Sequence, residues 1–199
     1  MANIVFYGDS NTYGYDARDF FGGRFSEKER WVSLVAKELG TGFNVIEEGL
    51  NGRRLPDIAI EESYLTHMTE RLTYGDYFVI MLGTNDILHE SHPDAKAAAH
   101  KMGRLLEWVS VPAFSQGFSV IVIAPVPIAD SPEYHDHHEQ SLILNTAYEK
   151  LCAEYGAVFM NADSWNVSLA CDGVHFSEEG HSAFAEGFLR MFHNHSPKK

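Results

Sequence analysis

A serine stands where an apolar segment ends near the start of the chain. The segment from Ile4 to Tyr7 is apolar, and Gly8, Asp9 and Ser10 follow it directly. A serine at the end of a strand, where the chain turns into a helix, can be held exposed and activated as a nucleophile. Taken alone, Ser10 has the ordinary alternative of a helix cap or turn residue. A nucleophilic role therefore requires a base, an orienting acid and oxyanion donors elsewhere in the sequence.

Asp172 and His175, near the other end of the sequence, are the two groups that such a serine needs. They stand three residues apart, just ahead of the last predicted helix. On a turn, this spacing lets the carboxylate accept a hydrogen bond from one imidazole nitrogen while the other nitrogen faces Ser10. His175 is one of 11 histidines and has the ordinary alternative of a surface or core residue. Its spacing from Asp172 and its position before a helix favour the role of a general base.

Hydrogen-bond donors for a tetrahedral oxyanion follow the second and third predicted strands. The backbone N–H groups of Ser10 and Gly52, with the side-chain amide of Asn85, could surround a developing alkoxide. Gly52 has the simpler alternative of permitting a positive φ, and Asn85 that of forming a turn. We predict that two adjoining carboxylates, Asp9 and Asp86, bind backbone N–H groups and support the loops. The whole set predicts acyl transfer.

The periodicity of the sequence predicts how these residues are brought together. Short runs rich in Val, Ile and Phe alternate with longer segments of helical period, a pattern typical of parallel strands joined by crossover helices. The predicted strands are Asn3–Tyr7, Phe43–Glu47, Tyr77–Leu82, Ser119–Ile123 and Val158–Asn161, and the predicted helices are Lys28–Leu39, Ile60–Arg71, Asp94–Val109, Gln140–Glu154 and Glu178–Phe192. The mostly unbroken apolar strands suit a sheet that is covered on both faces. Such a sheet binds its ligands outside the carboxyl ends of its strands, where the candidate residues fall.

Length and composition predict one globular domain over residues 1–199. The chain has 45% hydrophobic residues for a core and 22% charged residues for a surface, and no linker, repeat or low-complexity segment divides it. A short polar tail from about His193 is expected to fray. No stretch approaches the roughly 20 apolar residues that span a bilayer, and no basic segment precedes an apolar run at the N-terminus. We therefore expect a soluble, cytoplasmic protein.

The balance of charge narrows the choice of partners. With 28 Asp and Glu against 15 Lys and Arg, the formal net charge is -13. This charge repels phosphate backbones and anionic head groups, which argues against nucleic-acid binding and against a role at or in membranes. Small neutral or cationic molecules are the favoured partners. The 13% aromatic content is compatible with a homo-oligomer.

A second concentration of reactive side chains occurs at His135 to Glu139, which reads His-Asp-His-His-Glu. Metal binding is the sharper interpretation, but adjacent histidines in a loop give no fixed metal geometry. We interpret the segment as a solvated loop that leads into the following helix and lines the substrate entrance with Tyr13, Tyr15, Phe20 and Phe21. Those aromatic residues have core or oligomer contacts as their alternative. No metal and no cofactor is predicted.

Four blocks of the sequence together resemble the signature set of the SGNH (GDSL-like) hydrolases. They are Gly8-Asp9-Ser10-Asn11, Gly52, Gly83-Thr84-Asn85-Asp86 and Asp172-Gly173-Val174-His175. The resemblance implies a flavodoxin-like, three-layer α/β/α fold and the hydrolysis of carboxylic esters or thioesters. The implied catalytic set is Ser10, His175 and Asp172, and the implied oxyanion hole is Ser10, Gly52 and Asn85. The one departure is Asn11, where the name motif has leucine, and this position is not among the residues that carry chemistry.

Within that superfamily, the segment from Glu47 to Arg53 is most similar to the small-ester-cleaving arylesterase and acyltransferase branch. Two other classes stay open. One is a metal-dependent phosphoesterase that uses Asp9, Asn85, Asp172 and His175 with the loop histidines. The other is a non-catalytic binding domain on the same fold. The sequence leaves open the natural acyl group and alcohol, and the choice between hydrolysis and acyl transfer.

Overall fold

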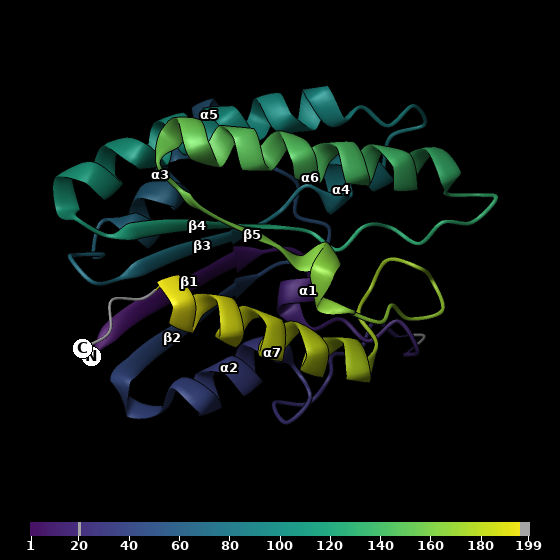
Figure 1. The fold of residues 1–199 in the computed structure, drawn as a ribbon, viewed down its shortest axis with the longest axis horizontal. Coiled ribbons are helices and arrows are strands. Elements are labelled where there is room, and N and C mark those ends of the chain that lie inside the picture. The colour runs from purple at the N-terminus through teal and green to yellow at the C-terminus, as the bar shows by residue number, and fades with distance from the viewer. Residues whose placement is uncertain (20, 196–199) are drawn as a thin grey trace.

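A single parallel sheet lies at the centre of the computed structural model, which describes residues 1–19 and 21–195 (Figure 1). The strands are β1 (Ala2–Gly8), β2 (Phe43–Gly49), β3 (Tyr77–Met81), β4 (Ser119–Ala124) and β5 (Val158–Asn161). Their order across the sheet is β2-β1-β3-β4-β5, and every neighbouring pair is parallel. This is the flavodoxin-like order, so the predicted fold with a five-stranded parallel sheet is confirmed.

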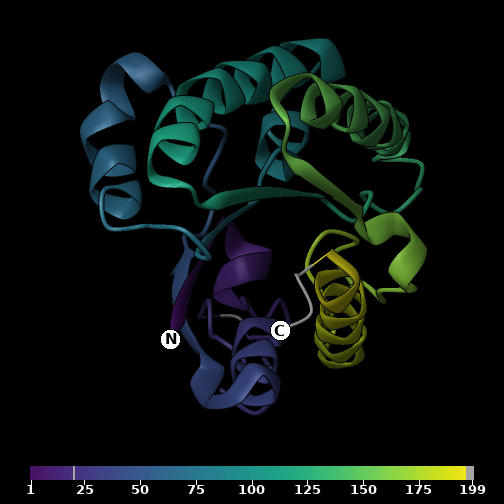
Figure 2. The same cartoon turned by 60° about the vertical axis from the view of Figure 1, so that its left-hand side comes forward.

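Helices cover both faces of the sheet (Figure 1). One face carries α3 (Ile58–Thr69), α5 (Ala95–Gln116) and α6 (His135–Tyr155), and the other carries α2 (Trp31–Leu39) and α7 (Glu178–His195). Figure 2 shows the same two layers on opposite sides of the strands. The short 3-10 helices η1 (Gly40–Gly42) and η2 (Ala162–Trp165) lie in connections. The arrangement is the three-layer α/β/α sandwich that the sequence predicts.

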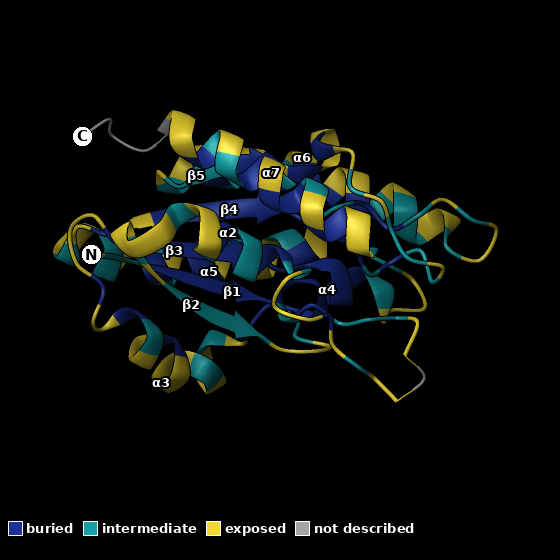
Figure 3. Ribbon diagram, turned by 90° about the horizontal axis from the view of Figure 1, so that it is seen from below, coloured by how far each residue is buried: buried dark blue, intermediate teal, exposed yellow. Residues whose placement is uncertain are grey.

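The central strands β1, β3 and β4 are apolar because both faces of the sheet are buried there, whereas no residue of the edge strand β2 is fully buried. Successive side chains of a strand point to opposite faces, and β1 shows the consequence. Val5 and Tyr7 join the apolar cluster beneath α3, α5 and α6, whereas Ile4 and Phe6 join the cluster beneath α2 and α7. Figure 3 shows β1 and β4 as buried and β2 as intermediate, among helices whose outward faces are exposed. Among the described residues, no helix is both long and apolar enough to span a membrane.

Helices α5 and α7 extend several residues beyond their predicted C-terminal ends. Helix α5 continues through Pro112 to Gln116, past the predicted end at Val109. Proline removes one backbone hydrogen bond from a helix, yet the last turns stay helical, and Ala113 packs against the core cluster. Helix α7 continues to His195, so the predicted polar tail is helical as far as the described residues extend.

Short helices that the sequence did not predict follow β1 and β3 directly. They are α1 (Ser10–Tyr13) and α4 (Thr84–Leu88). Asp9 caps α1 through its side chain, and Gly83 precedes α4 with a φ of 125°, a conformation that side chains with a Cβ rarely adopt. The candidate serine is the first residue of α1, and Asn85 lies in the first turn of α4. These sharp strand-to-helix turns place both residues at the carboxyl ends of the strands.

Candidate active site

Ser10, His175 and Asp172 lie in hydrogen-bonding order at the carboxyl ends of the strands. The Ser10 hydroxyl oxygen is 2.9 Å from His175 Nε2, and His175 Nδ1 is 2.6 Å from an Asp172 carboxylate oxygen. With the ring proton on Nδ1, the imidazole donates to Asp172, and its Nε2 accepts from the Ser10 hydroxyl. The fold therefore brings these three residues together although 165 positions separate Ser10 from His175.

Asp172 is held as a charged acceptor. Besides bonding the imidazole, it accepts the backbone N–H groups of Val174 and His175, each at 3.0 Å. Partial burial by itself would raise the pKa of this carboxyl. The hydrogen bonds from the His175 ring and from the two N–H groups outweigh that effect and lower its pKa below the ordinary value. The carboxylate therefore stays ionised and keeps the imidazole proton on Nδ1.

Asp9 connects the serine to the neighbouring strand ends. Its buried side chain accepts the backbone N–H of Asn11 at 2.9 Å as the cap of α1. A longer contact of 3.4 Å joins it to the side-chain amide of Asn85. Burial raises the pKa of Asp9 to about 6, against the lowering effect of the Asn11 N–H. These are the contacts that a loop-supporting role needs.

The long connection between α1 and α2 contacts the imidazole ring of His175. The centroid of the Tyr15 ring lies 4.5 Å from that of the His175 ring. An isolated antiparallel bridge pairs Tyr15 with Arg24, and the Arg24 guanidinium forms an ion pair with Glu47 of β2. The edge strand β2 therefore holds the connection in place, and this connection packs Tyr15 against His175.

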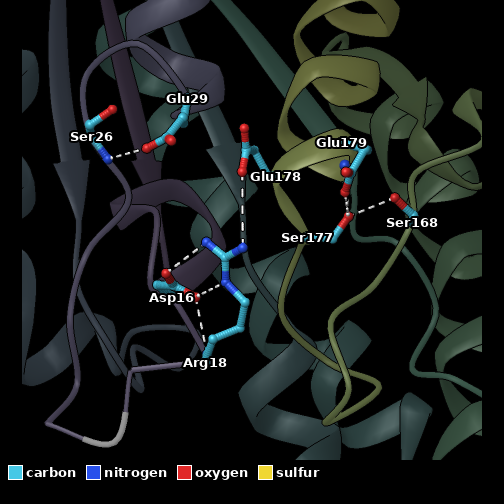
Figure 4. Close-up of polar contacts among 9 residues, drawn as sticks. Asp16, Arg18, Ser26, Glu29, Ser168, Ser177, Glu178 and Glu179 are labelled. Carbon is cyan, nitrogen blue, oxygen red and sulfur yellow. Dashed lines mark hydrogen bonds and ion pairs between the residues drawn. The ribbon is translucent and has the colours of Figure 1, made fainter.

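Figure 4 shows a further tie between the same connection and α7. Arg18 lies between two carboxylates. Its Nε is 2.9 Å from an Asp16 oxygen, and its Nη1 is 3.9 Å from an oxygen of Glu178, in the first turn of α7. The Arg18 and Glu178 side chains are exposed, so this ion pair contributes little to stability. Phe20, which the sequence groups with Tyr15 at the substrate entrance, lies outside the described residues, and the Phe21 side chain is exposed.

Gly52 occupies the tight turn that follows β2. The N–H of Arg53 donates to the carbonyl of Leu50 at 3.0 Å and closes a four-residue turn. Gly52 has a φ of 73°, which a type II turn requires at its third residue and which glycine adopts without strain. Within the described part of the chain, the Gly52 N–H has no backbone acceptor. The residue is exposed, so this N–H is available to a ligand.

The side-chain amide of Asn85 is fixed by its neighbours. Its nitrogen donates to the backbone carbonyl of Arg53 at 3.0 Å and makes the 3.4 Å contact with Asp9. Hydrogen bonds weaken as they approach 3.5 Å, so one amide hydrogen is firmly held and the other is only weakly engaged. The buried Asn85 side chain is thereby oriented by the two loops that flank it.

Asp86 ties the loop after β2 to the helices above it. One carboxylate oxygen accepts the backbone N–H of Leu55 at 2.8 Å, and the other lies 2.8 Å from Lys101 Nζ on α5. Both contacts are structural, and the side chain is almost fully buried. The supporting role that the sequence assigns to Asp86 stays a prediction.

Asn11 is a candidate site residue that sequence reasoning missed. Its side-chain nitrogen donates to the carbonyl of Val174 at 3.2 Å, and its side-chain oxygen accepts the N–H of Phe176 at 2.9 Å. The two bonds grip the main chain on both sides of His175, so the residue beside the candidate nucleophile also positions the candidate base. The signal in the sequence was the departure from leucine, because leucine can form neither bond.

Replacing Asn11 by leucine is expected to destabilise the protein. The carbonyl of Val174 and the N–H of Phe176 would lose these buried bonds, and each unsatisfied group costs about 1–3 kcal/mol. Urea unfolding followed by circular dichroism measures the loss. Asn44→Leu is the matched control because Asn44 is exposed and, in the described part of the chain, its side chain bonds only the side chain of Asn3. An Asn11→Leu variant as stable as this control would contradict the role of the amide.

The segment from His135 to Glu139 is the first turn of α6. The prediction of a loop that precedes a helix at Gln140 is therefore wrong. The histidines of this turn each bond a different partner: His135 bonds Asp130, His137 the Glu90 carbonyl and His138 the Ile128 carbonyl. Across residues 1–19 and 21–195, no group of three or more His, Cys, Asp or Glu side chains could hold a metal ion.

The five-stranded parallel sheet covered by helices is the fold of SGNH-type hydrolases. The chain belongs to the GDSL-like lipase/acylhydrolase family, whose sequence model matches residues 6–183. With the esterases among its structural neighbours, this membership makes the protein a carboxylic ester hydrolase.

Several solved structures share the fold over nearly their whole length. A putative arylesterase from Agrobacterium tumefaciens strain C58 is 29% identical, with a TM-score of 0.79, and the match covers 98% of this chain and 99% of that one. A carbohydrate acetylesterase family member from Sinorhizobium meliloti is 28% identical, with a TM-score of 0.82 and coverage of 98% of both chains. Est24, a carbohydrate acetylesterase from the same organism, is 26% identical, with a TM-score of 0.80 and coverage of 98% and 99%. A search of curated proteins found no match.

Proposed function

We propose that the protein hydrolyses small carboxylic esters through an acyl-enzyme on Ser10. The observation that carries the proposal is the chain of two hydrogen bonds, 2.9 Å and 2.6 Å long, that runs from the Ser10 hydroxyl through His175 to Asp172. In this geometry His175 Nε2 takes the hydroxyl proton as the Ser10 oxygen attacks the ester carbonyl. Asp172 holds the ring tautomer and stabilises the imidazolium that forms.

The tetrahedral intermediate then breaks its bond to the alcohol oxygen, and His175 returns the proton to the departing alcohol. Water attacks the carbonyl of the acyl-enzyme while His175 takes a proton from it. Ser10 leaves with that proton, and the carboxylic acid is released. The cycle consumes one water molecule and regenerates both side chains.

Three donors are proposed for the oxyanion. They are the backbone N–H of Ser10, the N–H of Gly52, which has no backbone acceptor in the described part of the chain, and the weakly engaged hydrogen of the Asn85 amide. Removing one such donor typically costs on the order of 10² to 10³ in turnover. Asp9 and Asp86 serve this site indirectly, by holding α1 and the loop after β2.

A short-chain ester is the proposed substrate. The similar structures are those of a putative arylesterase and of carbohydrate acetylesterases. The formal charge of -13 disfavours anionic lipid surfaces. We therefore propose a short acyl group on an aryl or sugar alcohol.

Covalent labelling with a fluorophosphonate tests the proposed nucleophile. The Ser10 oxygen should displace fluoride, and the peptide that contains Ser10 should gain the phosphonyl mass in mass spectrometry. A Ser10→Ala variant is the control and should leave this peptide unlabelled. A chelator should leave ester turnover unchanged. Turnover that is lost with the chelator, together with an unlabelled Ser10, would overturn the proposal in favour of a metal-dependent phosphoesterase.

A further inference from the structure

Arg53 is linked to the chain segments that carry all three proposed oxyanion donors, and the proposed mechanism gives it no role. It directly follows Gly52, its backbone carbonyl fixes the amide of Asn85, and its side chain reaches the end of β1 just before Ser10. The inference drawn from this arrangement rests on the proposed function of the site.

The guanidinium of Arg53 joins the carboxyl ends of β1 and β2. Its Nη1 donates to the carbonyl of Gly8 at 2.9 Å and also to the carbonyl of Glu48. Gly8 stands two residues before Ser10 and also accepts the N–H of Leu50, at 3.1 Å. One carbonyl at the end of β1 therefore anchors both the first residue of the Gly52 turn and the side chain of its last residue.

Neighbouring side chains hold this guanidinium in place. It lies over the ring of Tyr7, 4.4 Å from the ring centroid, and its Nη2 donates to the Tyr64 hydroxyl at 3.1 Å. That hydroxyl donates in turn to the carboxylate of Glu48 at 2.8 Å. A planar cation that stacks on an aromatic ring and donates in several fixed directions holds the ends of β1 and β2 rigidly together. A lysine side chain cannot make the same set of contacts.

The backbone of Arg53 completes the connection. Its N–H closes the turn on Leu50 at 3.0 Å, and this turn gives Gly52 its positive φ. Its carbonyl accepts one hydrogen of the Asn85 amide, which sets the direction of the other. Any displacement of Arg53 would therefore move the Gly52 N–H and the Asn85 amide together.

We propose that Arg53 is a positioning residue that sets the geometry of the oxyanion hole. Preorganised donors stabilise a transition state only when they already point to the place where charge develops, and an error of about 1 Å can cost on the order of 10²-fold in rate. Within the described residues, the Arg53 side chain donates to Gly8, Glu48 and Tyr64, and to none of Ser10, His175 and Asp172. Its effect is therefore on the oxyanion and not on proton transfer.

The test replaces Arg53 by methionine, which keeps an unbranched stem and removes the donors. We expect kcat for a short activated ester to fall on the order of 10²-fold, with KM within a few-fold of the wild type. Affinity for a boronic acid, which becomes a tetrahedral anion on Ser10, should fall in parallel with kcat. In Arg53→Lys, which keeps a positive charge near Asp9, the pH at which kcat/KM is half-maximal should not move, because the bonds between Ser10, His175 and Asp172 remain.

Arg54→Met is the matched control. The Arg54 side chain is exposed and pairs with Glu90 at 2.7 Å, so kcat and boronate affinity should stay at wild-type values. Arg53→Lys retains the charge and should recover only part of the lost kcat. It also serves as the test variant if Arg53→Met fails to fold, as judged by thermal melting. A folded Arg53 variant with wild-type boronate affinity, or an equal loss in Arg54→Met, would overturn the inference.

The outcome at Ser10 separates this inference from the proposed function. If Ser10→Ala retains turnover, the proposed acyl-enzyme is wrong, and the role of Arg53 falls with it. If Ser10→Ala is inactive while Arg53→Met keeps its kcat, the acyl-enzyme stands and only the positioning role fails.

Discussion

Replacing Ser10 by alanine is expected to reduce turnover of a short activated ester on the order of 10⁶-fold, because the variant has no oxygen with which to form the acyl-enzyme. The fold should persist, since the hydroxyl bonds only His175 among the described residues and alanine is a good helix former at the start of α1. Initial rates at saturating ester, with thermal melting in parallel, measure both quantities. Residual activity should reflect the oxyanion donors alone.

Ser164→Ala is a suitable control for this change. The Ser164 hydroxyl donates to the nearby Asn161 carbonyl at an exposed position, so its loss should leave turnover unchanged. A folded Ser10→Ala variant with more than about a tenth of wild-type turnover would exclude Ser10 as the nucleophile.

Replacing Asp172 by asparagine should have the next largest effect, a loss of kcat/KM on the order of 10⁴-fold. An amide nitrogen facing His175 Nδ1 is a donor, so the ring would carry its proton on Nε2. That nitrogen could then no longer accept the proton of Ser10. The asparagine oxygen can still accept the N–H groups of Val174 and His175, so the loop should remain folded. Steady-state kinetics with a short ester measures the loss.

Asp136→Asn provides the same chemical change at an exposed position in the first turn of α6. We expect wild-type kinetics from it. A loss below about tenfold in Asp172→Asn would show that the carboxylate does not hold the tautomer, and the mechanism would then lack its orienting acid.

The sheet was predictable because its signals are local. A run of a few apolar residues, such as Ile4 to Tyr7, is enough to predict a buried strand. All five predicted strands are present. Helices α1 and α4 were not predictable, because one turn is too short to show a period of 3.6 residues. The start of α6 was misread for a different reason. Its polar first turn resembles a loop, but His138 is held by the Ile128 carbonyl at 2.7 Å, a tertiary contact.

The residues of the candidate site likewise fall into those that local sequence signals identify and those that only tertiary contacts reveal. The sequence marks Ser10, Asp172 and His175 by residue type and by position at strand ends, and the fold brings them together. Asn11 is marked only by its departure from leucine and Arg53 carries no mark, because both side chains act through bonds to backbone atoms elsewhere in the chain. The partners of Asn11 are 163 and 165 positions away. A single sequence does not reveal such contacts.

The separation of Ser10 and His175 along the chain has a consequence for folding kinetics. Ser10 follows the first strand, and His175 directly precedes α7, the last helix, which packs beside α2. Contacts between such distant segments close the largest loops and form slowly. During refolding, ester turnover should therefore return only when α7 has docked, after the helical circular dichroism signal. Ester turnover thus measures the docking of α7 during folding.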